Sequence, residues 1–451
     1  MDRIPGFGPV DLGSNPSRLI NMKTDTKPGD FVEISLIKNS YRGIFLETPK
    51  DEKGIVLLKL GSGYNIGLNK KDIVDIKILK RAEEKREQVE EKDKIRKNRE
   101  KPNIAMIITG GTISSSLDSK TGAVKWLTSP EKLFKFYPEI FEKVNIAKIE
   151  VPFMMGSENL SFREWQKIAR VAVKLLNDSD IRGIIITHGT DTLHYTAAAL
   201  SFFLKNLNKP VVLTYSQRST DRASSDASLN LEASSLAALS DMAEVVVVGH
   251  ASSNDDYCYA LRGTKVKKLH SSRRDAFKPV NTGPIAKITR DTFIPLSNYK
   301  KRTKEKTKAD IRFEEKVALI KFYPGQDPDI LDYYRKKGYK GIVIEMLGLG
   351  HVSNSESRKP WISKIKEIQE KGVVVCAAAQ TIYGRLDPLV YSTGRELLSS
   401  GVIYLEDMLA ETAFVKLGWV LGHKEWAKSK EEVRKRMLEN VAGEFSDRIE
   451  E

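Results

Sequence analysis

The sequence predicts an α/β protein with parallel sheets, preceded by a small β-barrel module and a charged helical linker. Three observations support this prediction. Continuous apolar runs alternate with helical patterns after residue 102, short alternating runs separated by turn residues fill 25–79, and charged residues dominate the stretch between them. Strands buried on both faces of a parallel sheet are apolar throughout, whereas the strands of small barrels alternate.

The bulk properties limit the possible classes of protein. A chain of 451 residues is too long for one compact core and predicts two or three domains. The 74 basic and 60 acidic residues give a net charge of +14, which fits an acidic partner such as RNA and equally a lysine-rich surface. The two cysteines, Cys258 and Cys376, match no metal spacing. We therefore expect a cytoplasmic protein without a metal site or a membrane span.

The N-terminal part divides into three segments. Residues 1–24 have no periodicity and are expected to be a disordered tail. Residues 25–79 are expected to form an SH3-like barrel with strands at 31–36, 41–46, 54–60 and 73–78. Residues 80–101 are almost all charged and have no apolar stripe, which is typical of a solvated helical linker.

Two α/β domains are expected after this linker. The first, residues 102–298, has apolar strands at 104–108, 183–187, 211–214 and 245–248 and helical patterns at 161–177, 192–206 and 228–241. A solvated linker at 299–316 leads to the second domain at 317–440, which has strands at 317–322, 341–345 and 373–378 and a helix at 405–421. Residues 441–451 are expected to be a tail.

Two loops follow strands of the first domain, at the sheet edge where such folds bind ligands. In the loop 109–112, the two glycines allow backbone N–H groups to approach a ligand and stabilise an oxyanion, and Thr112 offers a hydroxyl nucleophile. Taken alone, this loop is equally well explained as a turn without chemistry. The loop 188–192 precedes a helix, and capping of that helix by Asp191 and Thr192 is the simpler explanation. Capping leaves its other polar residues unexplained.

A hydroxyl nucleophile needs a base or a neighbouring charge at neutral pH. A lysine close to an aspartate is a suitable activator. The segment 263–272 contains the candidates Lys265, Lys267 and Lys268, and composition does not distinguish among them.

These loops resemble the two signatures of bacterial-type asparaginases and glutaminases, TGGTI at 109–113 and HGTDT at 188–192. The resemblance covers about residues 103–422. The stretch Gly-Ser-Glu-Asn at 156–159 resembles the family's substrate-carboxylate loop, and the stretch at 277–284 resembles the segment that follows its catalytic lysine. Counting back without gaps then places that lysine at Lys268.

The resemblance implies a complete set of roles. Thr112 attacks the side-chain amide of glutamine or asparagine, and backbone N–H groups near Gly111 stabilise the oxyanion. A water activated at Thr190 releases the acyl group. The lysine and Asp191 relay protons and orient Thr190, and Asp191 binds the α-ammonium. The remaining substrate-binding residues would be Ser157, Glu158, His188 and Gly189.

The sequence departs from this family at one place. The family usually carries a tyrosine on the mobile loop after the first motif, and the loop from Ser114 to Val124 has none. Ser119 or Thr121 could take its place, or another residue could supply the hydroxyl. Efficient hydrolysis by the chain alone is therefore less expected.

The barrel and the charged linker are absent from plain asparaginases, and the whole arrangement resembles the glutaminase subunits of archaeal tRNA-dependent amidotransferases. That resemblance implies a GatE-type partner subunit, which uses the released ammonia with ATP and Mg²⁺ to convert Glu-tRNA(Gln) to Gln-tRNA(Gln). It also implies a homodimer of this chain within a heterotetramer. This chain has no P-loop and would itself need no cofactor. The alternatives are a free-standing asparaginase or glutaminase and a non-catalytic module that binds tRNA or protein.

Overall fold

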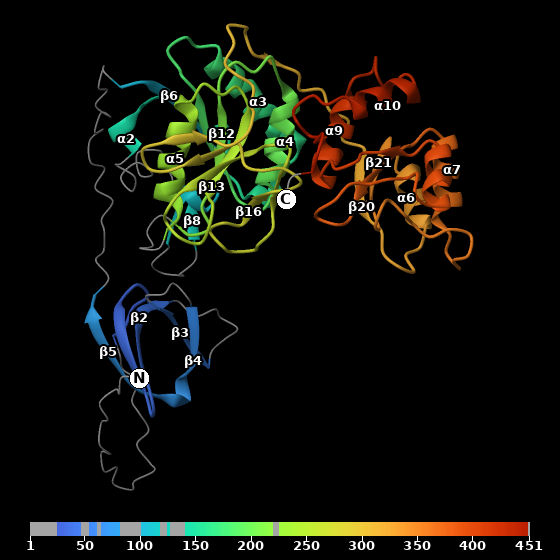
Figure 1. Ribbon diagram of the computed structural model, residues 1–451. Coiled ribbons are helices and arrows are strands. Elements are labelled where there is room, and N and C mark those ends of the chain that lie inside the picture. The colour runs from blue at the N-terminus through green and yellow to red at the C-terminus, as the bar shows by residue number, and fades with distance from the viewer. Residues whose placement is uncertain are drawn as a thin grey trace, which may run out of the picture. The chain divides into compact units, whose positions relative to one another are not determined.

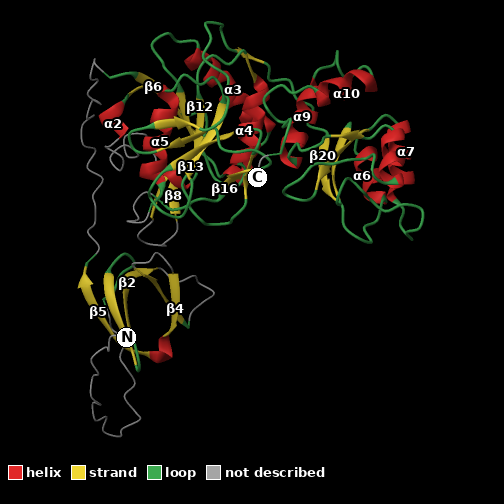
Figure 2. Cartoon of the chain, viewed as in Figure 1, coloured by secondary structure: helices red, strands yellow, loops and turns green. Residues whose placement is uncertain are grey.

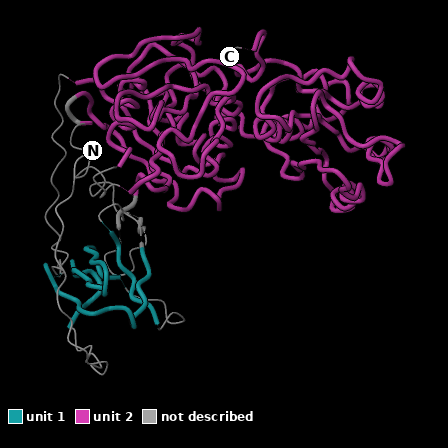
Figure 3. Tube along the Cα trace, turned by 60° about the horizontal axis from the view of Figure 1, so that its bottom comes forward, with its two compact units in different colours: residues 1–93, 117–123 teal, residues 94–116, 124–451 magenta. Residues whose placement is uncertain are grey.

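The computed structural model describes residues 25–46, 54–60, 65–81, 101–117, 124–126, 140–219 and 225–449. The expected tail at 1–24 and residues 82–100 of the expected charged linker lie outside these residues. The chain divides into two compact units, residues 1–93 with 117–123 and residues 94–116 with 124–451 (Figure 3).

The first unit is a five-stranded antiparallel sheet in the order β4-β3-β2-β1-β5 (Figure 1). Its strands are β1 (Phe31–Leu36), β2 (Ser40–Leu46), β3 (Ile55–Leu60), β4 (Asn65–Asn69) and β5 (Ile73–Lys80). Val32, Ile34, Val56 and Leu58 alternate along β1 and β3 and form its buried core, as the period of two in the sequence predicts. The sequence did not predict β4, because its asparagines and Gly67 are typical of turns.

The second unit contains an eight-stranded sheet in the order β18-β17-β14-β13-β12-β10-β6-β9. The five strands from β13 to β9 run parallel, and the other three pair antiparallel, so the sheet is mixed rather than purely parallel. The parallel strands are β6 (Asn103–Ile108), β9 (Asn145–Glu150), β10 (Ile184–Thr187), β12 (Val211–Thr214) and β13 (Val245–His250), and the antiparallel ones are β14 (Cys258–Arg262), β17 (Ala286–Ile288) and β18 (Phe293–Pro295).

Helices cover both faces of this sheet (Figure 2). Helices α3 (Phe162–Leu176) and α4 (Leu193–Phe203) pack with Ala105 and Ile107 of β6, whereas α5 (Ala227–Leu239) packs with Met106 and Ile108. Alternate residues of this strand therefore contribute to two cores, which explains why residues 104–108 are all apolar. Short elements complete the unit: α2 (Ile140–Lys143), β7 (Ser115–Leu117), β8 (Val124–Trp126), β11 (Leu204–Lys205), β15 (Val266–Lys268), β16 (Phe277–Pro279) and β19 (Lys308–Ala309).

The C-terminal part of this unit is a parallel four-stranded sheet in the order β20-β21-β22-β23. Its elements are β20 (Val317–Lys321), α6 (Asp329–Lys336), β21 (Gly341–Met346), α7 (Trp361–Glu370), β22 (Val374–Ala379), α8 (Ser392–Ser399), β23 (Ile403–Tyr404), α9 (Ala410–Gly422) and α10 (Lys430–Leu438). Helix α9 begins at Ala410 and not at residue 405 as expected. Glu406 has a φ of 48°, which a right-handed helix does not allow, so the helix starts beyond it.

Helix α9 joins the two sheets of this unit. It packs against β21 and against α4, and Phe202 of α4 stacks on Trp419 of α9 with ring centroids 5.6 Å apart. One continuous apolar core therefore includes strands of both sheets. The two α/β domains consequently share a buried interface that positions loops of one against helices of the other.

The segment 299–316 between these domains is mostly exposed, but parts of it are anchored on the fold. Lys300 and Arg302 donate hydrogen bonds to main-chain carbonyls, and Thr307 and Asp310 are buried. The expected C-terminal tail is packed in part as well, because the buried Glu444 accepts a hydrogen bond from Lys416 at 2.6 Å. Both stretches have polar sequences, and the polar groups that they bury have hydrogen-bond partners inside the fold.

Asp310 provides a test of this packing. Its carboxylate contacts Arg312 at 2.9 Å, His423 at 3.0 Å and Lys205 at 2.6 Å. Burial alone would raise the pKa of Asp310, but these three donors outweigh it and hold that pKa well below its ordinary value. Replacing Asp310 by asparagine is expected to cost about 2 kcal/mol and to lower the midpoint of thermal unfolding at pH 7 by roughly 4 °C.

The pH dependence supplies the control for Asp310→Asn. A carboxylate with a lowered folded-state pKa contributes stability above its unfolded pKa, and it loses that contribution as pH falls through the folded value. The difference between wild type and variant should therefore shrink below about pH 4. A difference of equal size at pH 7 and pH 3 would contradict the assignment.

Candidate active site

The two loops singled out in the sequence leave the same edge of the eight-stranded sheet. Strands β6 and β10 are parallel neighbours, and Ile108 lies opposite Thr187. The loop 109–112 and the loop 188–192 therefore start side by side at the carboxyl ends of the strands. Thr109 joins them directly, because its hydroxyl donates a hydrogen bond to the carbonyl of Thr187 at 2.8 Å.

The first loop depends on its glycines. Gly110 and Gly111 have φ values of 119° and 86°, which side-chain-bearing residues rarely adopt. A Cβ on Gly111 would lie 2.5 Å from the backbone nitrogen of Gly189, so glycine also allows the two loops to touch. Thr112 then begins a short 3-10 turn that ends at Ser114. The residue directly before Thr112 therefore lies against the second motif.

Lys268 connects the elements of the second motif. Its Nζ lies 2.8 Å from Oγ1 of Thr190 and 2.7 Å from Oδ1 of Asp191. The lysine belongs to β15, where successive side chains point to opposite faces. Lys267 points the other way and pairs with Glu411, and Lys265, in the bend directly before the strand, pairs with Asp407. Of these three lysines, Lys268 is therefore the one that reaches the loop 188–192.

A third segment, which forms the turn η3 (Ser157–Asn159), lies against the second loop. The buried Ser157 accepts a hydrogen bond at its Oγ from the N–H of Asp191 at 3.2 Å, and its carbonyl accepts one from Thr192 at 2.6 Å. Thr192 occupies the N-cap position of α4 but makes no side-chain capping bond. Capping therefore does not account for the polar loop. Glu158 is exposed and its carboxylate folds back over Gly156.

His188 lies in the core and not in the site. Its side chain is buried, Nδ1 donates to the carbonyl of Gly189 at 2.7 Å, and Nε2 accepts from the hydroxyl of Thr196 at 2.9 Å. Burial lowers the pKa of His188 to about 4, so the imidazole is neutral at pH 7. The side chain thus supports the loop from beneath, and any substrate contact of this residue would come from its main chain.

Ser114 and Thr187 are two residues that sequence reasoning missed. Their hydroxyls lie 3.3 Å apart beneath the loops, and both side chains are buried. The position of Thr187 at the end of an apolar strand, directly before the second loop, could have indicated this residue from the sequence. The proposed substitutes for the missing tyrosine, Ser119 and Thr121, lie outside the described residues.

Five basic residues that could contribute to binding an acidic partner such as RNA have partners within the chain. Three of them form ion pairs, Arg273 with Asp275, Arg274 with Asp255 and Lys301 with Asp241. Lys300 and Arg302 donate hydrogen bonds to main-chain carbonyls. Of these pairs, Lys301–Asp241 is exposed on both sides, with side-chain exposures of 62% and 59%, and such a pair is typical of a solvated surface. Within the described parts of the chain, no group of three or more His, Cys, Asp or Glu side chains is placed to hold a metal. No helix of those parts has both the length and the apolarity to cross a membrane.

Comparison with known proteins matches three parts of the chain to known families. The family "Asparaginase, N-terminal" matches residues 103–299, "Glutaminase/Asparaginase C-terminal domain" matches 316–437, and "GatD N-terminal domain" matches 26–79. Two solved L-asparaginases resemble it in structure. The thermostable enzyme from Thermococcus kodakarensis is 29% identical with a TM-score of 0.67, covering 76% of this chain and 99% of that one. L-asparaginase I from Vibrio cholerae is 27% identical with a TM-score of 0.65, covering 77% of this chain and 99% of that one. The asparaginase-like fold predicted from the motifs is confirmed.

Relatives in archaea extend over the barrel as well. The D subunit of the glutamyl-tRNA(Gln) amidotransferase of Pyrococcus abyssi is 48% identical over 425 residues, which are 93% of this chain and 94% of the relative. The corresponding protein of Thermococcus kodakarensis is 49% identical over 391 residues, 86% of each chain. That of Methanobrevibacter smithii is 42% identical over 424 residues, 93% of this chain and 94% of the relative. The chain therefore belongs to the family of glutamyl-tRNA(Gln) amidotransferase D subunits.

Proposed function

We propose that this chain is the glutaminase subunit of a tRNA-dependent amidotransferase and hydrolyses glutamine to glutamate and ammonia. The observation that carries the proposal is the contact of Lys268 with both Thr190 and Asp191, beside a glycine-rich loop that ends in a threonine. A lysine held between a hydroxyl and a carboxylate is suited to move protons, and a glycine-rich loop is suited to bind an oxyanion.

The reaction proceeds in two halves. Oγ1 of Thr112 attacks the side-chain carbonyl carbon of glutamine, and N–H groups near Gly111 stabilise the oxyanion of the tetrahedral intermediate. The C–N bond breaks, the hydroxyl proton passes to the leaving nitrogen, and ammonia departs from an acyl-threonine ester. A water activated at Thr190, which Lys268 and Asp191 orient, attacks that ester and releases glutamate.

Substrate binding uses the loop around Ser157. The carboxylate of Asp191 is largely exposed beside Lys268 and accepts hydrogen bonds from the α-ammonium group of glutamine. Ser157 and Glu158 hold the α-carboxylate end, and Gly189 leaves room for Ser157, since a Cβ there would lie 2.8 Å from its Oγ. His188 contributes by supporting the second loop, because its side chain is buried.

The released ammonia serves a partner in this proposal. The archaeal relatives are named as D subunits of an amidotransferase, and this chain shares their N-terminal domain. A GatE-type partner would activate Glu-tRNA(Gln) with ATP and Mg²⁺ and use the ammonia. The chain would act in the cytoplasm as a homodimer within a heterotetramer. The loop Gly348–Ser353 would complete the site of the neighbouring copy.

An ammonia-release assay tests the proposal, with glutamine and asparagine as substrates. We expect hydrolysis of glutamine to rise about tenfold or more when the GatE-type partner and acceptor tRNA are added. A glutaminase that is fully active only in the assembled complex releases ammonia only when the partner can use it. Turnover that the partner and tRNA leave unchanged would favour the free-standing asparaginase or glutaminase. No hydrolysis of either amide under any condition would favour the non-catalytic binding module.

A further inference from the structure

The segment that carries Lys268 contains three lysines, and each has its own carboxylate. Lys268 contacts Asp191 on the face of β15 that meets the two site loops. Lys267 points to the opposite face, as the period of two in a strand requires, and Lys265 lies in the bend directly before the strand. Lys265 lies 2.5 Å from Asp407, and Lys267 lies 2.5 Å from Glu411, both of the C-terminal domain. The position of β15 therefore depends on the neighbouring domain.

Glu411 contacts two elements, the strand β15 that carries Lys268 and the helix α4 that follows the loop 188–192. It lies in the first turn of α9, and its Oε1 is 2.5 Å from Nζ of Lys267 and 4.0 Å from Nε2 of His194. His194 belongs to α4, which starts directly after Thr192 of the second loop. Glu411 thus connects the strand of Lys268 with the helix that follows Thr190 and Asp191.

The surroundings of Glu411 favour its charged form. Burial raises its pKa, but Lys267 and His194 outweigh this effect and leave the pKa below its ordinary value. Burial is the main cause of the raised pKa of the half-buried Glu345, and the negative charge of Glu411 raises that pKa further. Burial lowers the pKa of His194 to about 4, so this side chain carries no charge at pH 7. Lys267 is accordingly the cation that balances Glu411.

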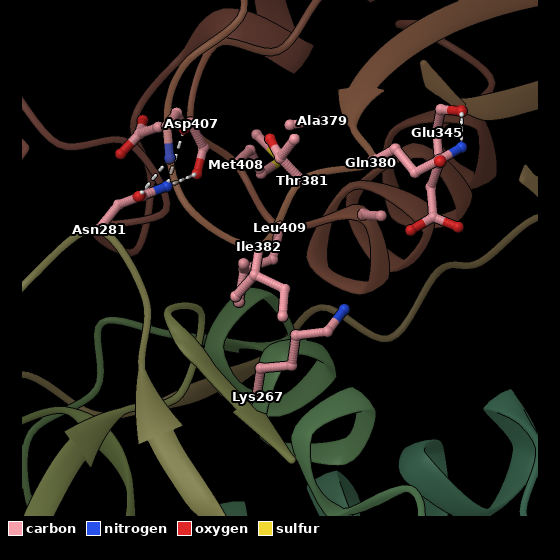
Figure 4. A pocket seen from close by; sticks show the side chains of 12 residues that line it. Lys267, Asn281, Glu345, Ala379, Gln380, Thr381, Ile382, Asp407, Met408 and Leu409 are labelled. Carbon is pink, nitrogen blue, oxygen red and sulfur yellow. Dashed lines mark hydrogen bonds between the residues drawn. The ribbon is translucent and has the colours of Figure 1, made fainter. Parts of the chain in front are cut away.

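Packing alone does not hold β15 at this place. Figure 4 shows Lys267 reaching from β15 towards a pocket between the two domains, which is lined by polar and apolar side chains of the C-terminal one. Asn281 bridges the same junction, because its side chain donates to the carbonyl of Gly384 at 3.0 Å and accepts from the N–H of Gly384 at 2.9 Å. Polar contacts therefore set the distance between β15 and the C-terminal domain.

We propose that Glu411 is a positioning residue for amide hydrolysis, which acts through Lys267 to hold Lys268 against Thr190 and Asp191. Asp407 supports the same strand through Lys265. The C-terminal domain would thereby control the proton-transfer groups of the site without touching substrate. This inference rests on the proposed glutaminase function and adds the residue that keeps its lysine in place.

Loss of the carboxylate has two physical consequences. Lys267 would no longer be held, so β15 could shift relative to the two loops, and a misplaced catalytic group slows the chemical step. The charge of Lys267 would also be left without compensation near the site, and an added positive charge lowers the pKa of neighbouring acids and bases. A purely structural residue would produce neither the second effect nor its reversal.

The test is Glu411→Gln in the full chain, assayed with the GatE-type partner and acceptor tRNA. We expect kcat for glutamine to fall about tenfold with KM changed less than about twofold. The pKa that governs kcat should move roughly half a pH unit lower. The double variant Lys267→Met/Glu411→Gln removes both charges and should restore that pKa, although not the full kcat.

Glu244→Gln is the matched control. The Arg262–Glu244 pair has side-chain exposures of 21% and 10%, against 22% and 13% for Lys267–Glu411. Glu244 precedes β13, at the opposite end of the parallel strands from the site. Its replacement should lower thermal stability to a similar extent and leave kcat and its pH profile unchanged.

The outcomes separate this inference from the proposed function. Wild-type kcat and pH profile in folded Glu411→Gln would overturn the inference alone, and so would equal losses in Glu411→Gln and Glu244→Gln. If Glu411→Gln does not fold, the double variant decides, because a wild-type kcat in it would also overturn the inference. A wild-type chain that hydrolyses no amide would overturn the proposed function and the inference with it.

Discussion

Replacing Thr112 by alanine is expected to reduce glutamine hydrolysis by about 10⁴-fold or more. The threonine follows two glycines with positive φ, and the second of them lies against Gly189 of the second loop. Removing its hydroxyl removes the atom that forms the acyl ester, and the remaining groups can only bind and polarise the substrate. The quantity to measure is kcat from ammonia release with glutamine, in the presence of the partner and tRNA.

Two further variants show whether the hydroxyl itself is responsible. Thr112→Val keeps the shape of the side chain and should be as inactive as the alanine variant, whereas Thr112→Ser keeps a hydroxyl and should retain measurable turnover. Binding of glutamine, measured by calorimetry, should change little in Thr112→Val. Activity near wild type in the valine variant would refute the role of Thr112 as the nucleophile.

Replacing Lys268 by methionine should lower kcat by about 10³-fold. Its Nζ is the atom that brings the Thr190 hydroxyl and the Asp191 carboxylate together, at 2.8 and 2.7 Å. Methionine has a similar length but neither charge nor proton donor, so Thr190 would lose its proton-transfer partner and Asp191 its counter-ion. Both halves of the reaction should slow, and rapid-quench measurement of ammonia and glutamate would follow them separately.

Lys301→Met is a suitable control for this experiment. Lys301 also pairs with an aspartate, Asp241, at 2.7 Å, but on the exposed surface of the same unit. This pair should contribute little to stability and nothing to turnover. A Lys268→Met variant with the kcat of Lys301→Met would show that the contact with Thr190 has no catalytic role.

The loops of the site were predictable because their chemistry is local. Glycines and threonines that follow apolar strands are visible in the sequence, and parallel neighbouring strands bring such strand ends together. The roles of Thr112, Thr190 and Asp191 remain predictions that these experiments test. His188 shows the limit of this reasoning, since its place in the motif did not reveal that its side chain points into the core.

The boundaries of regular structure were less predictable. The apolar strands and the helices α3, α4 and α5 follow their periodicity closely. The start of α9 and the packing of residues 299–316 do not, because a positive φ at Glu406 and the burial of Asp310 are set by neighbours distant in sequence. Polar composition indicated solvent exposure there, and most of these residues are exposed, but Thr307 and Asp310 are buried among partners inside the fold.

By itself, the sequence determined the class of fold, the order of its parts and the two loops of the site, since each depends on periodicity or on residues adjacent in the chain. The residue types left three lysines open and the resemblance to the family pointed to Lys268, but only the tertiary structure shows that Lys268 reaches Thr190 and which carboxylates meet the other two. Lys265, Lys267 and Lys268 have the same chemistry, and they differ in the face of this segment from which they project and in the carboxylate that meets them. Those carboxylates lie far away in the chain, so only folding brings each one to its lysine.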